Sequence, residues 1–342
     1  MTNKVGAQFR HDRLSPVGLY SAEGGVRKDV TQESRVSESN IGAFVENDTR
    51  WLPWLRSVAG LRSDRFDFDV NSSIDANSGT RHAMINSPKL SLIFGPWDKT
   101  EYFFNSGWGF HSNDARGVTA TVSPKEGTPI DPSPALVRTR GSEIGARTEV
   151  IPGLQSSVAL WQLHLNSELV FSGDAGDTEE SGASHRYGIE FNNHYVASDW
   201  LMLDGDLAFS QARFDQLQGD PDNLGRYVPG SVRTVVSLGA TVTEWGPWFG
   251  QFQLRYFGPR PLIEDNGQRS KGTTLAYMRT GYKLNASTKV SLDIFNLFNR
   301  KASDIDYYYK SRLQGEPADG VGDIHTHPAE PRTARVTLTV NF

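Results

Sequence analysis

The C-terminal stretch of the chain, residues 332–342 (RTARVTLTVNF), alternates between polar and apolar side chains up to its last residue. From residue 334 on, the even positions are apolar: Ala334, Val336, Leu338, Val340 and Phe342. A period of two places one face of a β-strand in an apolar environment and the other in a polar one. A sheet that closes on itself, as a membrane barrel does, gives its last strand a partner and leaves no free edge. We therefore expect this stretch to be the final strand of a transmembrane β-barrel.

The same alternation predicts further strands along the chain. It is clearest over residues 154–171, where the row opposite the apolar one contains Gln162, His164 and Asn166. These polar side chains would scatter around a helix, so a strand is favoured. The apolar row, which we expect to face outward with His164 facing inward, comprises Ala159, Trp161, Leu163, Leu165, Leu169 and Phe171. Further alternating stretches are residues 201–215, 232–242, 248–257 and 290–294.

Short and long connections alternate between these strands. The short ones are tight turns, most of them with Pro or Gly, at residues 51–54, 95–98, 151–153, 197–199, 244–247 and 285–287. The long ones are polar, at residues 11–34, 71–80, 110–137, 173–183, 216–228, 259–272 and 300–331. Short turns on one side and long loops on the other are typical of outer-membrane barrels. The pattern predicts an all-β fold, a transmembrane antiparallel up-and-down β-barrel of about 14 strands, over residues 1–342 without a helix.

Composition narrows the functional classes. The formal net charge of -5 does not favour a nucleic-acid partner. Because Cys is absent, thiolate catalysis, disulfides, Cys-ligated zinc and iron–sulfur clusters are excluded. No run of about 18 apolar residues is present, so transmembrane helices are not expected. The first residues lack the basic, apolar and small-residue segments of a signal peptide, so either the barrel interpretation is wrong or the chain lacks the true beginning of an exported protein.

Tryptophans gather at the short turns. Six of the eight lie in or beside them: Trp51, Trp54, Trp97, Trp200, Trp245 and Trp248. An indole combines an apolar ring with one N–H donor and is therefore favoured at a membrane interface. We expect these side chains to form a girdle at one edge of the barrel, in contact with outer-membrane lipid.

Five stretches together resemble the barrel of a TonB-dependent outer-membrane receptor. They are residues 103–117 (FFNSGWGFHSNDARG), 140–147 (RGSEIGAR), 226–233 (RYVPGSVR), 290–299 (VSLDIFNLFN) and 331–342. Each is weak by itself, but their order, ending at the final residue, is fairly specific. Within them, Asn296 and Asn299 are expected to end a strand by satisfying backbone groups with their side-chain amides.

The resemblance implies uptake of a ferric siderophore or a similar large nutrient through a barrel in the cell outer membrane. Family members have a barrel of roughly 22 strands, preceded by a plug domain, a segment that contacts the energy-coupling protein TonB, and a signal peptide. About 14 strands therefore resemble the C-terminal part of such a barrel, with the plug and the signal peptide not present. In the family the terminal aromatic residue is read by the barrel assembly machinery, and Phe342 occupies that position here.

The resemblance also implies a nutrient site on the extracellular loops. The candidate ligand-binding residues are His111, Asn113, Arg116, Tyr307, Tyr308, Tyr309, His325 and His327. Tyr and Arg side chains can hold an anionic, aromatic chelate by stacking and by charge-assisted hydrogen bonds. For the SNDARG stretch a structural role at a strand-to-loop exit is favoured over a binding role.

No metal site, resident cofactor or catalytic residue is predicted. His325 and His327 are two apart with Asp323 nearby, but no fourth ligand is identifiable. The acidic stretch at residues 174–180 lacks the spacing of a calcium loop. Inward carboxylates are instead expected to pair with arginines across the wall. The carboxylates are Glu168, Asp204, Asp206 and Asp293, and the arginines are Arg147, Arg233, Arg255 and Arg279.

Two other functions remain open at this point. A passive outer-membrane channel, complete at about 14 strands, requires residues 1–10 to pair with residues 332–342. A barrel hydrolase would use His164, which stands between Gln162 and Asn166 without a serine signature. A soluble propeller or sandwich is disfavoured because no repeat is found and because the connections alternate in length.

Overall fold

A computed structural model describes residues 1–172 and 177–342, without side chains for residues 169–180. The main sheet contains β1 (Thr2–Glu23), β2 (Val26–Leu52), β3 (Leu55–Ser72), β4 (Gly79–Trp97), β5 (Thr100–Ser112), β6 (Leu136–Thr148), β7 (Leu154–Leu165), β10 (Ser184–Ser198), β11 (Leu201–Gln218), β12 (Gly225–Tyr227), β13 (Thr234–Trp245), β14 (Trp248–Phe257), β15 (Thr273–Lys283), β16 (Thr288–Phe295) and β19 (Thr333–Val340). Separate hairpins are formed by β8 (Glu168–Ser172) with β9 (Asp177–Ser181) and by β17 (Ser303–Ser311) with β18 (Val321–Pro328). The described helices are η1 (Asp75–Asn77) and α1 (Ala115–Thr119).

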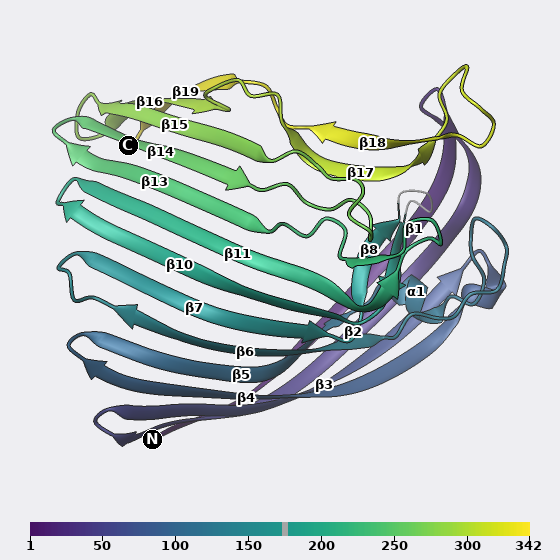
Figure 1. Cartoon of the computed structure of the whole chain (residues 1–342), viewed down its shortest axis with the longest axis horizontal. Helices are drawn as coiled ribbons and strands as arrows, with labels where there is room; N and C mark the ends of the chain where they lie inside the picture. Colours follow the sequence, from purple (N-terminus) through teal and green to yellow (C-terminus); the bar gives the residue numbers. More distant parts are fainter. Residues whose placement is uncertain (173–176) are drawn as a thin grey trace. The chain divides into compact units, whose positions relative to one another are not determined.

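The main sheet is antiparallel and follows the order of the chain (Figure 1). It has 15 strands, of which only the short β12 lies off the path that runs from β1 to β19. This confirms the expected all-β, up-and-down architecture. In the part of the chain that is described, β1 and β19 do not pair with each other, so the sheet is not closed. No described helix is long and apolar enough to span a membrane.

Two local expectations about the connections are wrong. Residues 11–34 are not a loop, because β1 and β2 continue as one hairpin whose turn contains Gly24 and Gly25, both at positive φ. Side chains on both faces of this hairpin are largely exposed, so its sequence carries no apolar row to mark the strands. The connection after β5 also contains a helix, α1, where none was expected. The acidic residues 174–180 lie outside the residues whose side chains are described.

The chain divides into two compact units, and the division runs across strands β4 to β7. The first unit contains Met1–Ile93, Asn105–Ser142 and His164–Glu168. The second contains Phe94–Phe104, Glu143–Leu163 and Leu169–Phe342.

In the first unit, the two faces of β2 have opposite character. On one face Glu46 accepts hydrogen bonds from Lys4 of β1 at 3.1 Å and from Lys89 of β4 at 2.6 Å. On the other face Ile41 and Val45 are exposed. Because successive side chains of a strand point to opposite faces, β2 separates a charged surface from an apolar one.

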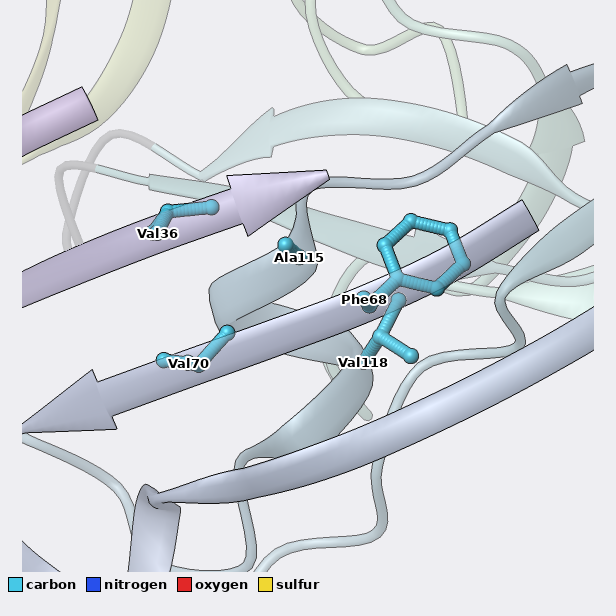
Figure 2. Close-up of a cluster of buried hydrophobic side chains, with 5 residues drawn as sticks. All are labelled: Val36, Phe68, Val70, Ala115 and Val118. Atoms are coloured by element: carbon cyan, nitrogen blue, oxygen red, sulfur yellow. The ribbon is translucent and has the colours of Figure 1, made fainter. Parts of the chain in front are cut away.

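A small apolar core lies on the charged face of β2 and β3 in this unit. Figure 2 shows Val118 of α1 beside the ring of Phe68, with the other members of the cluster around them. The buried members are Val36, Phe68, Val70, Ala115 and Val118, and Phe66 and Ala135 pack against them. The helix thus uses its apolar side chains to cover a patch of the sheet that would otherwise be exposed.

The second unit repeats the two-faced arrangement. Its exposed apolar row crosses the sheet through Leu203 of β11, Leu238 of β13 and Leu338 of β19. On the opposite face Asp293 of β16 is buried and accepts a hydrogen bond from Arg279 of β15 at 2.6 Å and another from the Tyr277 hydroxyl. For Asp293 and Arg279, the expectation that inward carboxylates pair with arginines is therefore confirmed.

The alternate side chains of β7 point to the opposite faces of the sheet from those that the sequence predicted. Trp161 lies against Gly188 of β10, where a Cβ would be 2.8 Å from the indole ring. Leu160, in the opposite row, is 54% exposed, and Gln162 in that row is exposed as well. Alternation within β7 puts His164 in the row of Leu160, so the prediction that Trp161 faces outward and His164 inward is wrong. Because Gly188 has no side chain, it leaves room for the ring of Trp161 on the inner face.

Truncation of Phe68 tests the core beneath α1. The ring is 1% exposed, so Phe68→Ala is expected to lower the free energy of unfolding by about 3–5 kcal/mol through lost burial and the resulting cavity. Urea unfolding of the detergent-solubilised protein measures the change. Leu313→Ala is the matched control because Leu313 is 69% exposed. Equal losses in the two variants would contradict a packed core at this place.

Candidate functional site

The SNDARG stretch forms the strand-to-helix junction after β5. Asp114 precedes α1, and its Oδ1 accepts hydrogen bonds from the backbone N and from Nε of Arg116, both at 2.9 Å. Asn113 is buried, and its Nδ2 donates to the carbonyl of Pro134 at 2.7 Å. Asn113 and Arg116 are therefore engaged in local structure, whereas His111 lies at the end of β5.

The ion pair with Arg116 governs the charge of Asp114. Burial alone raises the pKa of Asp114, but hydrogen bonds from the side chain and backbone of Arg116 outweigh it and lower the pKa below its ordinary value. The carboxylate is thus held in its charged form as the N-cap of α1. Its contribution to stability is complete above the pKa of an unperturbed aspartate, and it is lost as the pH falls through the lowered value.

Asn77 joins the loop that contains it to the loop that contains α1. Its Oδ1 accepts from the backbone N of Thr121 at 2.9 Å and of Val122 at 3.0 Å, and its Nδ2 donates to the Val122 carbonyl at 2.8 Å. The Thr119 hydroxyl donates to the Asn77 carbonyl at 2.8 Å. Asn77 is fully buried. No motif marks this residue in the sequence, because its partners are more than 40 positions away.

The tyrosine and histidine candidates come together on the β17–β18 hairpin. Tyr307 pairs with His325 in the register, and the rings of Tyr309 and His325 stack with centroids 3.8 Å apart. Tyr308 belongs to the opposite row of the hairpin by alternation. His327 has its Nδ1 3.8 Å from a carboxylate oxygen of Asp304. Among the described residues, no group of three or more His, Cys, Asp and Glu side chains could hold a metal ion.

The second unit contains a cavity of about 500 Å³ that the sequence did not predict. Its apolar lining includes Phe257, Leu275 and Phe295, and its cationic lining includes Arg255 and Lys271. Such a volume lies within the range of roughly 300–1,000 Å³ that is usual for small-molecule sites. The remaining lining residues are Val232, Gln253, Gly258, Arg260, Thr273, Ala276, Tyr277, Asn296, Ser303, Asp304 and Glu330. The whole lining comes from four strands and four connections, which explains why no local pattern marks it.

Asn296 and Asn299 follow the end of β16, as the sequence led us to expect, and Asn296 also lines this cavity. The Asn296 Nδ2 donates to the carbonyls of Arg300 at 2.9 Å and Glu330 at 3.0 Å, and its Oδ1 accepts from the backbone N of Arg300. The Asn299 Oδ1 accepts from the backbone N of Arg332 at 3.1 Å. Both amides satisfy backbone groups just after β16, which confirms the expectation.

The remaining expected ion pairs have different partners. Arg147 pairs with Glu101, at 2.5 Å, and Asp204 pairs with His194, at 2.6 Å. In the described part of the chain, Arg233 and Arg255 have no carboxylate partner. The expectation that they pair with an inward carboxylate is therefore wrong, and Arg255 instead lines the large cavity.

The turn tryptophans are exposed in both units. Within the second unit Trp200 stacks on Trp245 with centroids 6.1 Å apart, and Trp248 meets Tyr282 edge to face at 4.9 Å. The others are Trp51 and Trp54 in the first unit and Trp97 in the second. Phe342 follows the end of β19 and is fully exposed. A girdle and an assembly signal stay predictions.

Substitution of Asn77 tests the link between the two loops. Asn77→Ala removes three hydrogen bonds and leaves partly buried backbone groups of residues 121 and 122 unpaired, so we expect a loss of about 2–4 kcal/mol in the free energy of unfolding. Urea unfolding measures it, and proteolysis within residues 121–130 is expected to accelerate. Asn3→Ala, which removes one exposed side-chain pair with Asn47, is the control. Unchanged protease resistance of residues 121–130 would contradict the role of Asn77.

Solved structures with a similar fold cover nearly the whole chain. The ferric yersiniabactin uptake receptor FyuA from Yersinia pestis has a TM-score of 0.71 at 14% identity, over 99% of this chain and 51% of that one. The ferric-catecholate import receptor Fiu from E. coli K12 gives 0.69 at 13% identity, over 99% and 51%. The copper transporter OprC gives 0.69 at 18% identity, over 99% and 53%. The chain therefore spans about half the length of these proteins, and the likeness shows a shared fold.

Family assignment rests on the sequence match. No curated protein is similar enough in sequence to count as a relative. A family model described as TonB dependent receptor-like, beta-barrel, matches residues 1–297, which is most of the chain. The matched region includes every strand from β1 to β16. The chain belongs to the TonB-dependent receptor family and represents part of its β-barrel.

Proposed function

We propose that the protein is an outer-membrane receptor that takes up a ferric siderophore or a similar large anionic chelate with energy from TonB. Members of its family are transporters rather than enzymes. The three structural neighbours described above carry names that refer to uptake of ferric chelates or copper, which supports a metal-chelate cargo. Coupling to TonB would pass through the plug domain that the family resemblance implies.

Membrane location is supported by the surface of the sheet. Large apolar side chains such as Phe9 in the first unit and Leu338 in the second are exposed in rows, which would be costly in water. Hydrocarbon is the environment in which such rows are stable, provided that the backbone is hydrogen-bonded within the sheet. Exposed tryptophans at the turns, such as Trp245, fit the adjoining interface.

The observation that supports a chelate ligand is the 500 Å³ cavity of the second unit. Its walls combine aromatic rings, which can stack on a planar chelating group, with the cations of Arg255 and Lys271, which attract a negative charge. Asp304 and Glu330 at the same cavity limit the excess of positive charge and can accept hydrogen bonds from ligand hydroxyls. A drug-sized anion is therefore the class of ligand that best fits the lining.

Uptake experiments test this function. In iron-limited cells, the double variant Arg255→Gln, Lys271→Gln is expected to bind a catecholate or carboxylate ferric siderophore about tenfold to one-hundredfold more weakly, because two charged donors are removed. Radiolabelled iron uptake and equilibrium binding to outer-membrane fractions measure the effect. Arg312→Gln, an exposed residue on the β17–β18 connection, removes a charge at a distance from the lining and is the control.

The same assay separates active from passive transport. Removal of TonB is expected to abolish accumulation while leaving binding intact. Accumulation that persists without TonB would support a passive channel instead. Siderophore binding that is unchanged in the double variant would exclude the cavity as the ligand site.

A further inference from the structure

A second, smaller cavity lies beside the ligand-sized one and shares Val232 with it. Its volume is about 80 Å³. That exceeds the roughly 30 Å³ of one water molecule in the liquid and is far below the volume of a drug-sized site. A ligand that fits this space is a small ion or a single functional group of a larger molecule.

Three arginines line the small cavity, Arg213, Arg233 and Arg269, and no carboxylate does. Within the described residues none of the three forms an ion pair. Elsewhere in this unit an arginine that meets a carboxylate binds it closely, as Arg279 binds Asp293 at 2.6 Å. Like charges gathered without a counter-charge repel one another, so an anion in the cavity would stabilise the arrangement.

Two of the guanidinium groups are held in place by neutral partners. Arg213 stacks on the ring of Tyr227, with its Cζ 3.4 Å from the ring centroid, and its Nη1 donates to the Ala212 carbonyl at 3.1 Å. Arg269 donates from Nη2 to the Pro259 carbonyl at 3.0 Å and from Nη1 to Asn266 Oδ1. These bonds use a minority of the five N–H groups on each side chain and leave the others for a ligand.

The segments that carry the arginines are tied to one another by the backbone. The N–H of Tyr227 donates to the Glu264 carbonyl at 2.9 Å, and that of Gly230 donates to the Pro261 carbonyl at 2.8 Å. Glu264 lies in the connection between β14 and β15. A Cβ at Gly225 would overlap the Glu264 carbonyl, so glycine is needed where β12 meets that connection. The backbone segments that carry the binding groups are therefore fixed before a ligand arrives, which lowers the entropic cost of binding.

The neutral polar lining adds one further donor and two hydroxyl oxygens. The Gln211 Oε1 accepts from the Tyr187 hydroxyl at 2.8 Å, which turns the Gln211 amide so that its NH₂ remains as a donor. The hydroxyls of Ser210 and Ser231 donate their single hydrogen to the carbonyls of Val232 and Val228, so they can only accept a hydrogen bond from a ligand. The lining thus offers charged N–H groups in forks, two neutral hydroxyl acceptors and no carboxylate, which matches an oxyanion better than a cation.

We propose that this cavity binds a phosphate group through Arg213, Arg233 and Arg269. The group can belong to free inorganic phosphate or to the headgroup of a phospholipid, because both present the same oxygens. The proposal does not depend on the identity of the nutrient that the receptor takes up, since it concerns a different cavity and a different ligand class.

Binding measurements on the full chain in detergent test the proposal with two probes. The first is inorganic phosphate, followed by titration calorimetry in a chloride buffer. The second is phosphatidic acid in detergent micelles, compared with diacylglycerol in the same micelles. The double variant Arg233→Gln, Arg269→Gln is expected to bind either probe at least about tenfold more weakly, because charge-assisted hydrogen bonds are lost. The control Arg312→Gln removes a charge from an exposed site elsewhere in the second unit.

Each possible binding result either supports the phosphate site or overturns it. Saturable phosphate binding that is lost in the double variant and kept in Arg312→Gln supports the site with a free anion as ligand. Binding of phosphatidic acid alone, with the same sensitivity, supports it with a headgroup as ligand. Because Arg233 and Arg269 are exposed, the variants should fold, and Arg233→Lys with Arg269→Lys should restore part of the affinity by keeping the charge. No saturable binding of either probe, or equal affinity in the double variant and the control, would overturn the proposal.

Discussion

The antiparallel hydrogen-bond ladder is the constraint on which the other features depend. Between β1 and β19 each described strand of the main path is paired on both sides, so the backbone donors and acceptors of these inner strands are satisfied within the sheet. Alternate side chains are then free to carry opposite chemistry on the two faces, as Glu46 and Val45 do on neighbouring positions of β2. A wall of this kind can be apolar on one side and charged on the other without a conventional core.

Two long connections between strands, one in each unit, are packed against strands of the sheet. In the first unit the connection after β5 lies over β2 and β3, fixed by the apolar contact of Val118 with Phe68 and by the polar contacts of Asn77. In the second unit the connection between β14 and β15 is fixed to β12 by backbone bonds such as that from Tyr227 to Glu264. Both connections are therefore held in fixed positions by contacts with strands of the sheet. Both also lie where a ligand or another segment could contact the sheet.

The sequence analysis correctly predicted the strands and turns that a local alternation of polar and apolar residues reveals. The alternation in residues 332–342 correctly predicts β19, and the short turns are where they were expected. The alternation did not predict the correct face where burial depends on a neighbouring strand. Trp161 is the example, because its ring occupies the space left by Gly188. The alternation failed also for residues 11–34, where both faces are exposed, and for α1, whose five residues are too short to establish a helical period.

Local sequence patterns predicted the candidate sites less well than they predicted the strands. Motifs drew attention to Asn113 and Arg116, but these residues hold a loop together. The two cavities of the second unit take their linings from positions between 210 and 330, so only the pairing of distant strands brings the groups together.

Their shared residue, Val232, stands between a cavity with mixed charges and a cavity with arginines alone. Two neighbouring cavities of such different volume and charge select different ligands, because the larger accepts a bulky molecule and the smaller accepts only a compact anionic group. Val232, just before β13, therefore affects both cavities, and a change in its backbone would alter both at once.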